Sequence, residues 1–195
     1  MKIGVLALQG AFIEHQKILN QLQIETIDVR LPKDLHLIDG LIIPGGESTT
    51  IGKLAQAYSF MDPLKQFSIK KPVWGTCAGM IFIARRIDAI NQTSLKLMDI
   101  TVKRNAFGRQ VDSFIAPLDI PALAVYSQAT FPGIFIRAPE VISCGQSVEV
   151  LSCLSDGRIV AVKENHWLAT SFHPELTEDL RLHQFFIDMI SKSKS

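Results

Sequence analysis

The sequence predicts an α/β fold in which a central, mostly parallel sheet is covered by helices on both faces. Apolar runs at residues 3–8 and 41–43 are typical of strands buried on both sides. Each run is followed by a helical stretch, and a repeated strand–helix order requires parallel strands joined by crossovers. The chain has 195 residues, of which 47% are hydrophobic and 20% charged, enough for one buried core. We therefore expect one domain over residues 1–195.

The first half of the chain alternates strands and helices. Apolar or β-rich runs predict strands at residues 3–8, 24–29, 41–43 and 72–74. After the first strand, Phe12, Leu19 and Leu22 are spaced to share one helix face. Further helices are expected at residues 51–57 and 80–87, with a turn near Asp62 and Pro63 between them.

The second half changes character. Short strands are expected at residues 96–103, 134–137, 147–154, 158–162 and 168–171. Asp156 and Gly157 favour a tight hairpin between two of them. Residues 179–190 should form a closing helix with its apolar side chains on one side.

Charge and cysteine content exclude several classes of partner. The formal net charge is +1, so no global field attracts the chain to nucleic acid or to an anionic membrane. The apolar opening at residues 2–8 is too short for a membrane span and lacks a small-residue cleavage site. Three cysteines do not form a disulfide framework, and an odd count indicates a reducing compartment. We expect a cytoplasmic protein.

One cysteine stands in a turn suited to a nucleophile. Residues 72–80 (PVWGTCAGM) pass from a short strand through GTCAG directly into an apolar helix. This pattern matches a nucleophile elbow with Cys77 in the serine position, held at strained backbone angles with its side chain exposed. The helix N-terminus there favours a thiolate. The alternative is that Cys77 is a buried packing residue, which is our interpretation of Cys144 and Cys153.

The segment His173-Pro174-Glu175 offers the base that a catalytic thiol needs. Proline favours extended angles at residue 173, which places the side chains of His173 and Glu175 on one side. Glu175 can then fix one ring nitrogen while the other faces the cysteine. The alternative is a surface loop in which Glu175 is solvated. The remaining histidines are expected to be mostly solvated, and no paired metal-ligand spacing is present: His15, His36, His166 and His183.

A glycine loop and two arginines complete the candidate site. Gly45 and Gly46 follow a buried strand and let backbone N–H groups turn toward a developing negative charge, so we expect an oxyanion hole formed by the N–H groups of Gly46 and Ala78. The loop suits a phosphate equally well, although it lacks the Walker lysine. Arg104 and Arg137 each end a β-like stretch and suit a substrate carboxylate, but either is as well explained as a surface arginine.

Taken together, these motifs resemble the class I (triad) glutamine amidotransferases. More narrowly, the chain is similar to the glutaminase subunits of pyridoxal 5'-phosphate synthase, the PdxT/SNO family. The matching segments span nearly the whole chain: residues 4–11 (GVLALQGA), 45–50 (GGESTT), 104–114 (RNAFGRQVDSF), 135–139 (FIRAP) and 170–177 (TSFHPELT). The elbow and His-Pro-Glu identify the superfamily, whereas the first, third and fourth segments are specific to this subunit.

The resemblance implies a three-layer, flavodoxin-like fold and hydrolysis of L-glutamine to glutamate and ammonia. It implies a γ-glutamyl thioester on Cys77, with His173 as base and then acid and Glu175 orienting it, and no cofactor or metal. Glutamine would be held by a set of residues of which the last two act partly through backbone: Gly45, Gly46, Glu47, Arg104, Ile136 and Arg137. The ammonia would pass to a separate synthase subunit, which docks near Gln9, Gly10 and Ala11 and orders the oxyanion loop.

Three other hypotheses remain. A γ-glutamyl hydrolase or protease-like enzyme on the same fold would need a more open cleft for a larger substrate. A binding module that senses a metabolite would not need the complete Cys, His and Glu set. The glutaminase subunit of another pathway is disfavoured by residues 104–114 and 135–139.

Overall fold

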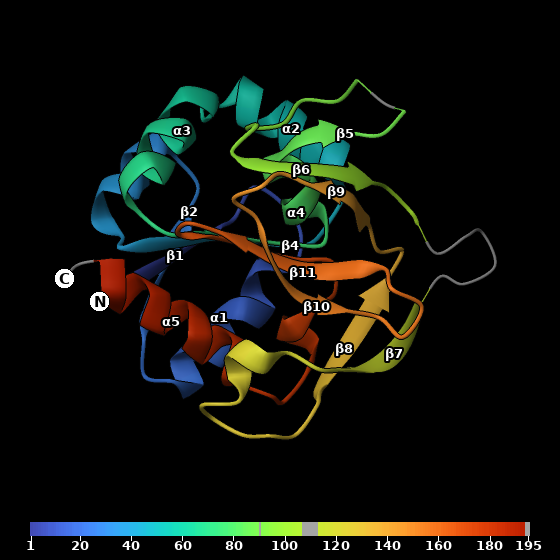
Figure 1. Ribbon diagram of the computed structural model, residues 1–195. Helices are drawn as coiled ribbons and strands as arrows, with labels where there is room; N and C mark the ends of the chain where they lie inside the picture. The colour runs from blue at the N-terminus through green and yellow to red at the C-terminus, as the bar shows by residue number, and fades with distance from the viewer. Residues whose placement is uncertain (90, 107–112, 194–195) are drawn as a thin grey trace.

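A curled ten-stranded sheet forms the centre of the protein. The computed structural model describes residues 1–89, 91–106 and 113–193. Within them, ten strands form a sheet in the order β2-β1-β3-β4-β12-β11-β9-β6-β5, with β10 paired to β11 (Figure 1). Its first five strands are parallel neighbours: β2 (Glu25–Val29), β1 (Lys2–Leu6), β3 (Gly40–Ile43), β4 (Val73–Thr76) and β12 (Trp167–Thr170).

The other half of the sheet is largely antiparallel. It contains β11 (Ile159–Glu164), β10 (Glu149–Cys153), β9 (Glu140–Cys144), β6 (Met98–Lys103) and β5 (Ala84–Ile87), of which β5 and β6 pair in parallel. A separate two-stranded sheet joins β7 (Ser113–Leu118) to β8 (Phe131–Ile136). Short 3-10 turns lie at η1 (Pro32–Leu37), η2 (Pro121–Leu123) and η3 (Pro174–Leu176).

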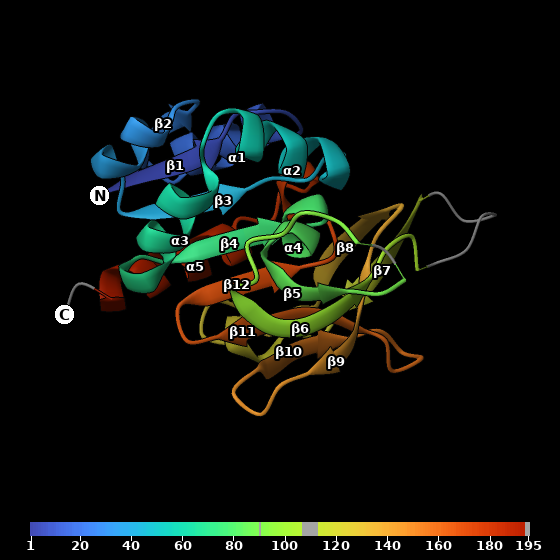
Figure 2. The ribbon, with the colours of Figure 1, turned by 90° about the horizontal axis from the view of Figure 1, so that it is seen from above.

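Helices cover both faces of the parallel half (Figures 1 and 2). One face carries α2 (Ser48–Ala57), α3 (Met61–Lys70) and α4 (Ala78–Ile83), and the other carries α1 (Phe12–Gln21) and α5 (Arg181–Ser193). Because successive strand residues face opposite sides, Leu41 and Ile43 pack under α2–α4 while Ile42 packs under α1 and α5. The predicted α/β class with a central sheet between helices is confirmed.

Several predictions of local structure are wrong. Residues 80–87 are not one helix, because α4 ends at Ile83 and the backbone turns extended at Ala84, where β5 gains ladder hydrogen bonds to β6. Asp62 and Pro63 do not form a turn but lie in the first turn of α3, where a missing N–H costs no helical hydrogen bond. Strands β7 and β9 were not predicted. β7 includes Pro117, which its place in a two-stranded ribbon tolerates.

Candidate active site

Three loops meet at one edge of the parallel sheet. β3, β4 and β12 are neighbours, so the residues that follow them come together at the carboxyl edge, where sites of such sheets form. These residues enclose a cavity of about 280 Å³. The cavity is lined by residues from all three loops and from the ends of β6 and β8: Gly46, Glu47, Ser48, Cys77, Ala78, Ile81, Arg104, Asn105, Ile136, Arg137 and His173.

Cys77 sits on a strained turn between β4 and α4. Its angles are φ 47° and ψ −105°, a conformation that costs on the order of 1–3 kcal/mol and is held by the surrounding structure. A Cβ on Gly75 would lie 2.5 Å from the carbonyl oxygen of Gly79, and one on Gly79 would collide with the carbonyl oxygen of Ile43. Both glycines are therefore required for the elbow to form.

The Cys77 side chain is not exposed, contrary to the sequence prediction. The residue lines the cavity but is only 6% accessible, because it packs between β12 and β8. The cysteine N–H donates to the carbonyl oxygen of Thr170 (2.8 Å), and Sγ lies 3.9 Å from the carbonyl oxygen of Ile136. Strands β12 and β8 thus fix its position from two sides.

His173 and Glu175 lie against the cysteine. The His173 Nδ1 is 2.7 Å from Glu175 Oε1, and the Cys77 side chain lies beside the same imidazole ring. Burial lowers the pKa of His173, but its hydrogen bonds to Cys77 and Glu175 outweigh burial and raise that pKa to about 10. A protonated imidazole beside a thiol is the arrangement that activates a cysteine nucleophile.

The backbone of this segment differs from the predicted extended form. His173 has φ −106° and ψ 85°, and Pro174–Leu176 then forms a 3-10 turn that brings the Glu175 carboxylate back to the imidazole. Glu175 is 5% accessible, which excludes the alternative of a solvated carboxylate in a surface loop.

The glycine loop after β3 packs on the histidine and on the loop after β1. A Cβ on Gly45 would collide with Cε1 of His173 and lie 3.4 Å from Cβ of Cys77. Gly45 itself does not line the cavity, whereas Gly46 and Ala78 do, so both of the proposed oxyanion-hole residues face the space next to the sulfur. The loop has no room for a side chain at Gly45.

The predicted partner-contact loop touches this glycine loop directly. The Ala11 N–H donates to the carbonyl oxygen of Gly45 (3.1 Å), and the Glu47 N–H donates to Oε1 of Gln9 (3.3 Å). A Cβ on Gly10 would collide with the Gly45 carbonyl oxygen, so the two loops are in contact without intervening space. Any change at residues 9–11 therefore reaches the oxyanion loop without passing through another element.

Glu47 and Arg104 form the rim of the cavity. Glu47 caps α2 by accepting from the Thr50 hydroxyl (2.7 Å) and from the N–H groups of Thr49 (3.0 Å) and Thr50 (2.7 Å). Partial burial raises the pKa of Glu47, but these hydrogen bonds prevail and hold it at about 2. Arg104 donates to the Glu47 carboxylate (3.3 Å) and to Gln92 (2.8 Å). The arginine is therefore anchored at the cavity and is not a free surface side chain.

Ile136 and Arg137 also lie where the sequence analysis expects them, at the end of β8. Both line the cavity, and Arg137 has a positive φ of 42°, which turns the chain sharply at the strand end. The predicted segment 104–114 lies partly outside the described residues, which stop at 106 and resume at 113.

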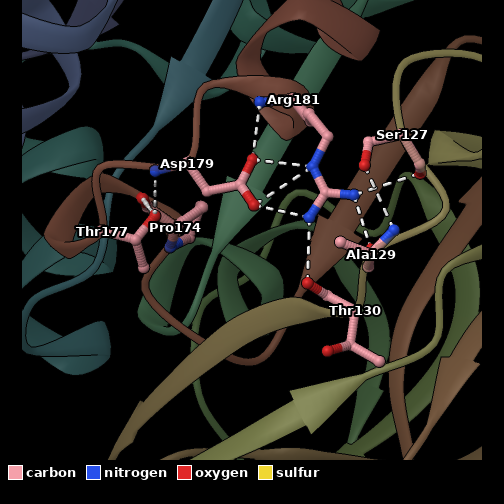
Figure 3. Close-up of polar contacts among 7 residues, drawn as sticks. All are labelled: Ser127, Ala129, Thr130, Pro174, Thr177, Asp179 and Arg181. Carbon is pink, nitrogen blue, oxygen red and sulfur yellow. Dashed lines mark hydrogen bonds and ion pairs between the residues drawn. The ribbon is translucent and has the colours of Figure 1, made fainter.

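An arginine absent from the sequence analysis ties the histidine turn to β8. The Arg181 guanidinium donates to the carbonyl oxygens of Ser127 (3.3 Å), Ala129 (2.6 Å) and Thr130 (3.0 Å), as Figure 3 shows. It also pairs with Asp179 at 2.6 Å. Three carbonyls in the loop before β8 are thus held by one side chain at the start of α5.

Further hydrogen bonds carry this link back to the triad. The Asp179 N–H donates to Oγ1 of Thr177 (3.2 Å), and that hydroxyl donates to the carbonyl oxygen of Pro174 (3.0 Å), also in Figure 3. The His173 N–H donates to the carbonyl oxygen of Ile134 in β8 (2.8 Å). The strand that ends in the candidate substrate residues and the turn that carries the histidine are therefore fixed to each other.

Two histidines expected to be solvated are fully buried behind the triad. His15 and His183 are both 0% accessible. Burial, followed by the charges of His183 and His173, lowers the pKa of His15 well below its usual value, and burial lowers the pKa of His183 to about 3. The signal was present in the sequence: each lies at helical spacing from buried apolar residues, such as Leu19 for His15 and Phe186 for His183.

The remaining candidates lie away from the cavity. His36 is exposed, and His166 is hydrogen-bonded to the carbonyl oxygen of Ser68 (2.6 Å). Cys144 and Cys153 are free thiols at the ends of β9 and β10. In the described part of the chain, no group of three His, Cys, Asp or Glu residues is arranged to hold a metal ion, and no helix is long and apolar enough to cross a membrane.

Comparison with known proteins shows close relatives over the full length. The model of the SNO glutamine amidotransferase family matches residues 5–192. A protein named pyridoxal 5'-phosphate synthase subunit PdxT from Herpetosiphon aurantiacus is 52% identical over 193 residues, 97% of this chain and 100% of that protein. One of the same name from Dehalococcoides mccartyi is 54% identical over 197 residues, 100% of both chains.

Solved structures agree with these matches. A crystal structure titled as a glutamine amidotransferase superposes with a TM-score of 0.91 at 45% identity and covers 97% of this chain and 98% of its own. The structure of PurLQS from Thermotoga maritima superposes with a TM-score of 0.70 at 16% identity and covers 96% of this chain and 97% of its own. That second similarity shows the shared fold alone.

Proposed function

The chain belongs to the SNO glutamine amidotransferase family, and we propose that it is the glutaminase subunit of a pyridoxal 5'-phosphate synthase. It hydrolyses L-glutamine to L-glutamate and ammonia, and the ammonia passes to a synthase subunit. The observation that supports this chemistry is that Cys77 and His173 line the cavity together while Glu175 is hydrogen-bonded to the His173 ring from behind. We propose that residues 1–195 form one domain. Its three free cysteines support a reducing cytoplasm as its compartment.

The reaction begins at the sulfur. The Cys77 thiolate attacks the side-chain amide carbon of glutamine, and the resulting oxyanion is stabilised by the N–H groups of Gly46 and Ala78. His173, protonated through its contacts with the thiol and Glu175, donates its proton to the departing ammonia. The γ-glutamyl thioester that remains is hydrolysed by a water from which His173 takes a proton. Glu175 holds the imidazole in place throughout.

The small volume of the cavity supports a single amino acid as the substrate. Its volume of about 280 Å³ lies at the small end of ligand pockets, which run from about 300 to 1,000 Å³. A γ-glutamyl hydrolase acting on a long chain would need a larger cleft. At the rim, Glu47 stays ionised because its pKa is held at about 2, so it can pair with the α-ammonium group. Arg104 and Arg137 are the cations available for the α-carboxylate.

The contact between residues 9–11 and the glycine loop supports coupling to a partner. In this proposal the synthase subunit docks on Gln9, Gly10 and Ala11. The hydrogen bonds from Ala11 to Gly45 and from Glu47 to Gln9 then transmit the docking to the oxyanion hole. Activity stays low until the partner binds, which prevents release of ammonia without an acceptor.

The test is glutamate release from glutamine by the purified chain, alone and with the synthase subunit of the same source. The proposal expects release that the partner stimulates and that Cys77→Ala removes. Gln9→Ala should reduce the stimulation by the synthase, because the Gln9 side chain accepts from the Glu47 N–H in the glycine loop. Release that is absent in both states, or equal with and without the synthase, would refute the proposed partner function.

A further inference from the structure

Two buried histidines stand directly behind the carboxylate that orients the catalytic base. His15 in α1 and His183 in α5 are joined ring to ring, with Nδ1 of His15 2.9 Å from Nε2 of His183. The other nitrogen of His15, Nε2, lies 3.4 Å from Oε2 of Glu175 and 3.3 Å from Oγ1 of Thr76. Since Oε1 of Glu175 already accepts from His173, the His15 ring faces the second oxygen of the same carboxylate.

The protons of this pair can be assigned from burial and hydrogen bonding. Both rings are neutral, since burial depresses the pKa of each, so each carries one N–H. Nδ1 of His183 is buried and makes no hydrogen bond to the described residues. An unpaired acceptor is tolerated better than an unpaired donor, so the His183 proton sits on Nε2 and is donated to His15. The single proton of His15 is then on Nε2 and points toward Glu175 and Thr76.

The buried carboxylate of Glu175 requires a hydrogen-bond donor such as the N–H of His15. Oε2 of Glu175 is buried and has no hydrogen-bond partner within the described part of the chain, and Nε2 of His15, 3.4 Å away, is a donor that faces it. A buried carboxylate oxygen without a donor is unfavourable, and the group can then rotate away from its partner. The neutral N–H of His15 supplies a dipole toward that oxygen without competing for the proton of His173.

We propose that His15, fixed in its tautomer by His183, is a positioning residue that holds the second oxygen of Glu175 and thereby orients the imidazole of His173. This assignment rests on the proposed glutaminase function for its role in turnover. The side chains of this cluster come from three elements: α1, α5 and the turn at residues 173–176. His15 acts through Glu175 and does not itself reach the cavity lining.

The groups that surround this cluster define what can titrate there. His15 comes from α1, His183 from α5, Glu175 and His173 from the turn after β12, and Cys77 from the elbow after β4. β4 itself contributes neutral side chains: the Trp74 ring packs at 5.7 Å from His15 and 4.9 Å from His183, and Thr76 offers its hydroxyl. A change in His15 is therefore transmitted first to Glu175 and then to His173.

The experiment compares His15→Leu with His15→Gln. Leucine removes the N–H donor and fills the buried site with an apolar side chain. Glutamine places an amide nitrogen about where Nε2 of the imidazole lies, so it restores a donor to Glu175. His36→Gln, on an exposed histidine, is the matched control. For His15→Leu we expect kcat to fall by about 10-fold or more, the scale seen when the partner that orients a functional histidine is lost, with KM within about twofold. His15→Gln should recover most of kcat.

A second readout does not depend on glutamine. NMR of histidine-labelled protein follows the pH at which the His173 ring loses its proton, which is about 10 in the intact cluster. A less well oriented carboxylate supports the imidazolium less, so His15→Leu should titrate about one unit lower or more, and His15→Gln near the wild type. This titration separates the inference from the proposed function. If the protein turns over no glutamine but the titration shifts, the proposed function fails and the positioning role stands.

Two outcomes would overturn the positioning role. One is an unchanged His173 titration and kcat in a folded His15→Leu protein, and the other is a loss in His15→Gln as large as in His15→Leu. In a Glu175→Gln background, His15→Leu should cause no further loss of kcat, and a full additional loss would show that His15 acts by another route. If His15→Leu does not fold, His183→Leu serves instead, with a smaller shift in the same direction because His15 is left without its fixed tautomer.

Discussion

Arg181→Ala should destabilise the protein much more than loss of an ordinary surface ion pair. Arg181 donates to the carbonyl oxygens of Ser127, Ala129 and Thr130 in addition to its pairing with Asp179, and its side chain is only 14% accessible. A hydrogen bond to a charged group contributes about 1.5–3 kcal/mol. The loop carbonyls are near the surface, so water replaces part of the lost hydrogen bonding. We therefore expect the free energy of unfolding to fall by about 2–3 kcal/mol, less than the sum over the separate hydrogen bonds.

The matched control is Arg30→Ala. Arg30 also pairs with an aspartate two residues before it, Asp28, at 2.8 Å, but its side chain is 59% accessible. An exposed pair of this kind contributes about 0–1 kcal/mol. Arg181→Lys keeps the charge but loses the planar fork, so it should fall between the two alanine variants.

Urea unfolding at fixed protein concentration measures the difference. For a chain of this length, a loss of 2–3 kcal/mol corresponds to a fall in Tm of roughly 5–10 °C, with an unchanged m-value. If Arg181→Ala and Arg30→Ala agree within about 0.5 kcal/mol, the carbonyl contacts of Arg181 do not stabilise the loop before β8, and the link between that loop and the histidine turn fails with them.

Three further predictions concern the site itself. The pKa of His173 rises from 6.5 in the unfolded chain to about 10 in the native one, so its contribution to stability is complete below pH 6.5 and disappears as the pH rises through 10. Compared with His173→Gln, the wild type should therefore lose unfolding free energy between pH 6.5 and 10. Parallel pH profiles of the two proteins would refute the assignment. Arg137→Ala should raise KM for glutamine with little change in kcat, and an unchanged KM would mean that the carboxylate binds elsewhere. Gly79→Ala should lower the free energy of unfolding by more than about 2 kcal/mol, because the new Cβ collides with the backbone oxygen of Ile43 and neither atom can move away. A smaller loss in thermal unfolding would show that the elbow tolerates a side chain.

Local motifs made the placement of the main cavity residues predictable from the sequence. The cysteine elbow is encoded within nine residues, and its glycines carry the close approach of α4 to β3 and β4 that the structure shows. His173 and Glu175 are two residues apart, so their contact needs no long-range information. The first four parallel strands followed from apolar or β-rich runs that alternate with helical stretches. In each case the cause acts over a few neighbouring residues.

Contacts between distant segments were not predictable in the same way. His15 and His183 are 168 positions apart and meet only because α1 and α5 cover the same face of the sheet. The partners of Arg181 are backbone carbonyls, which have no sequence signature. β5 and β9 are short strands whose pairing with β6 overrides local propensity. The helical spacing of both buried histidines was nevertheless a usable signal of burial.

The most direct test of the central claim is a single-turnover reaction of glutamine with the purified chain in the presence of its synthase subunit, quenched in acid and analysed by intact mass. The account predicts a transient γ-glutamyl adduct on Cys77 that forms with release of ammonia and is absent from Cys77→Ala. Glutamate production by Cys77→Ala at the wild-type rate, or an adduct on another residue, would contradict it.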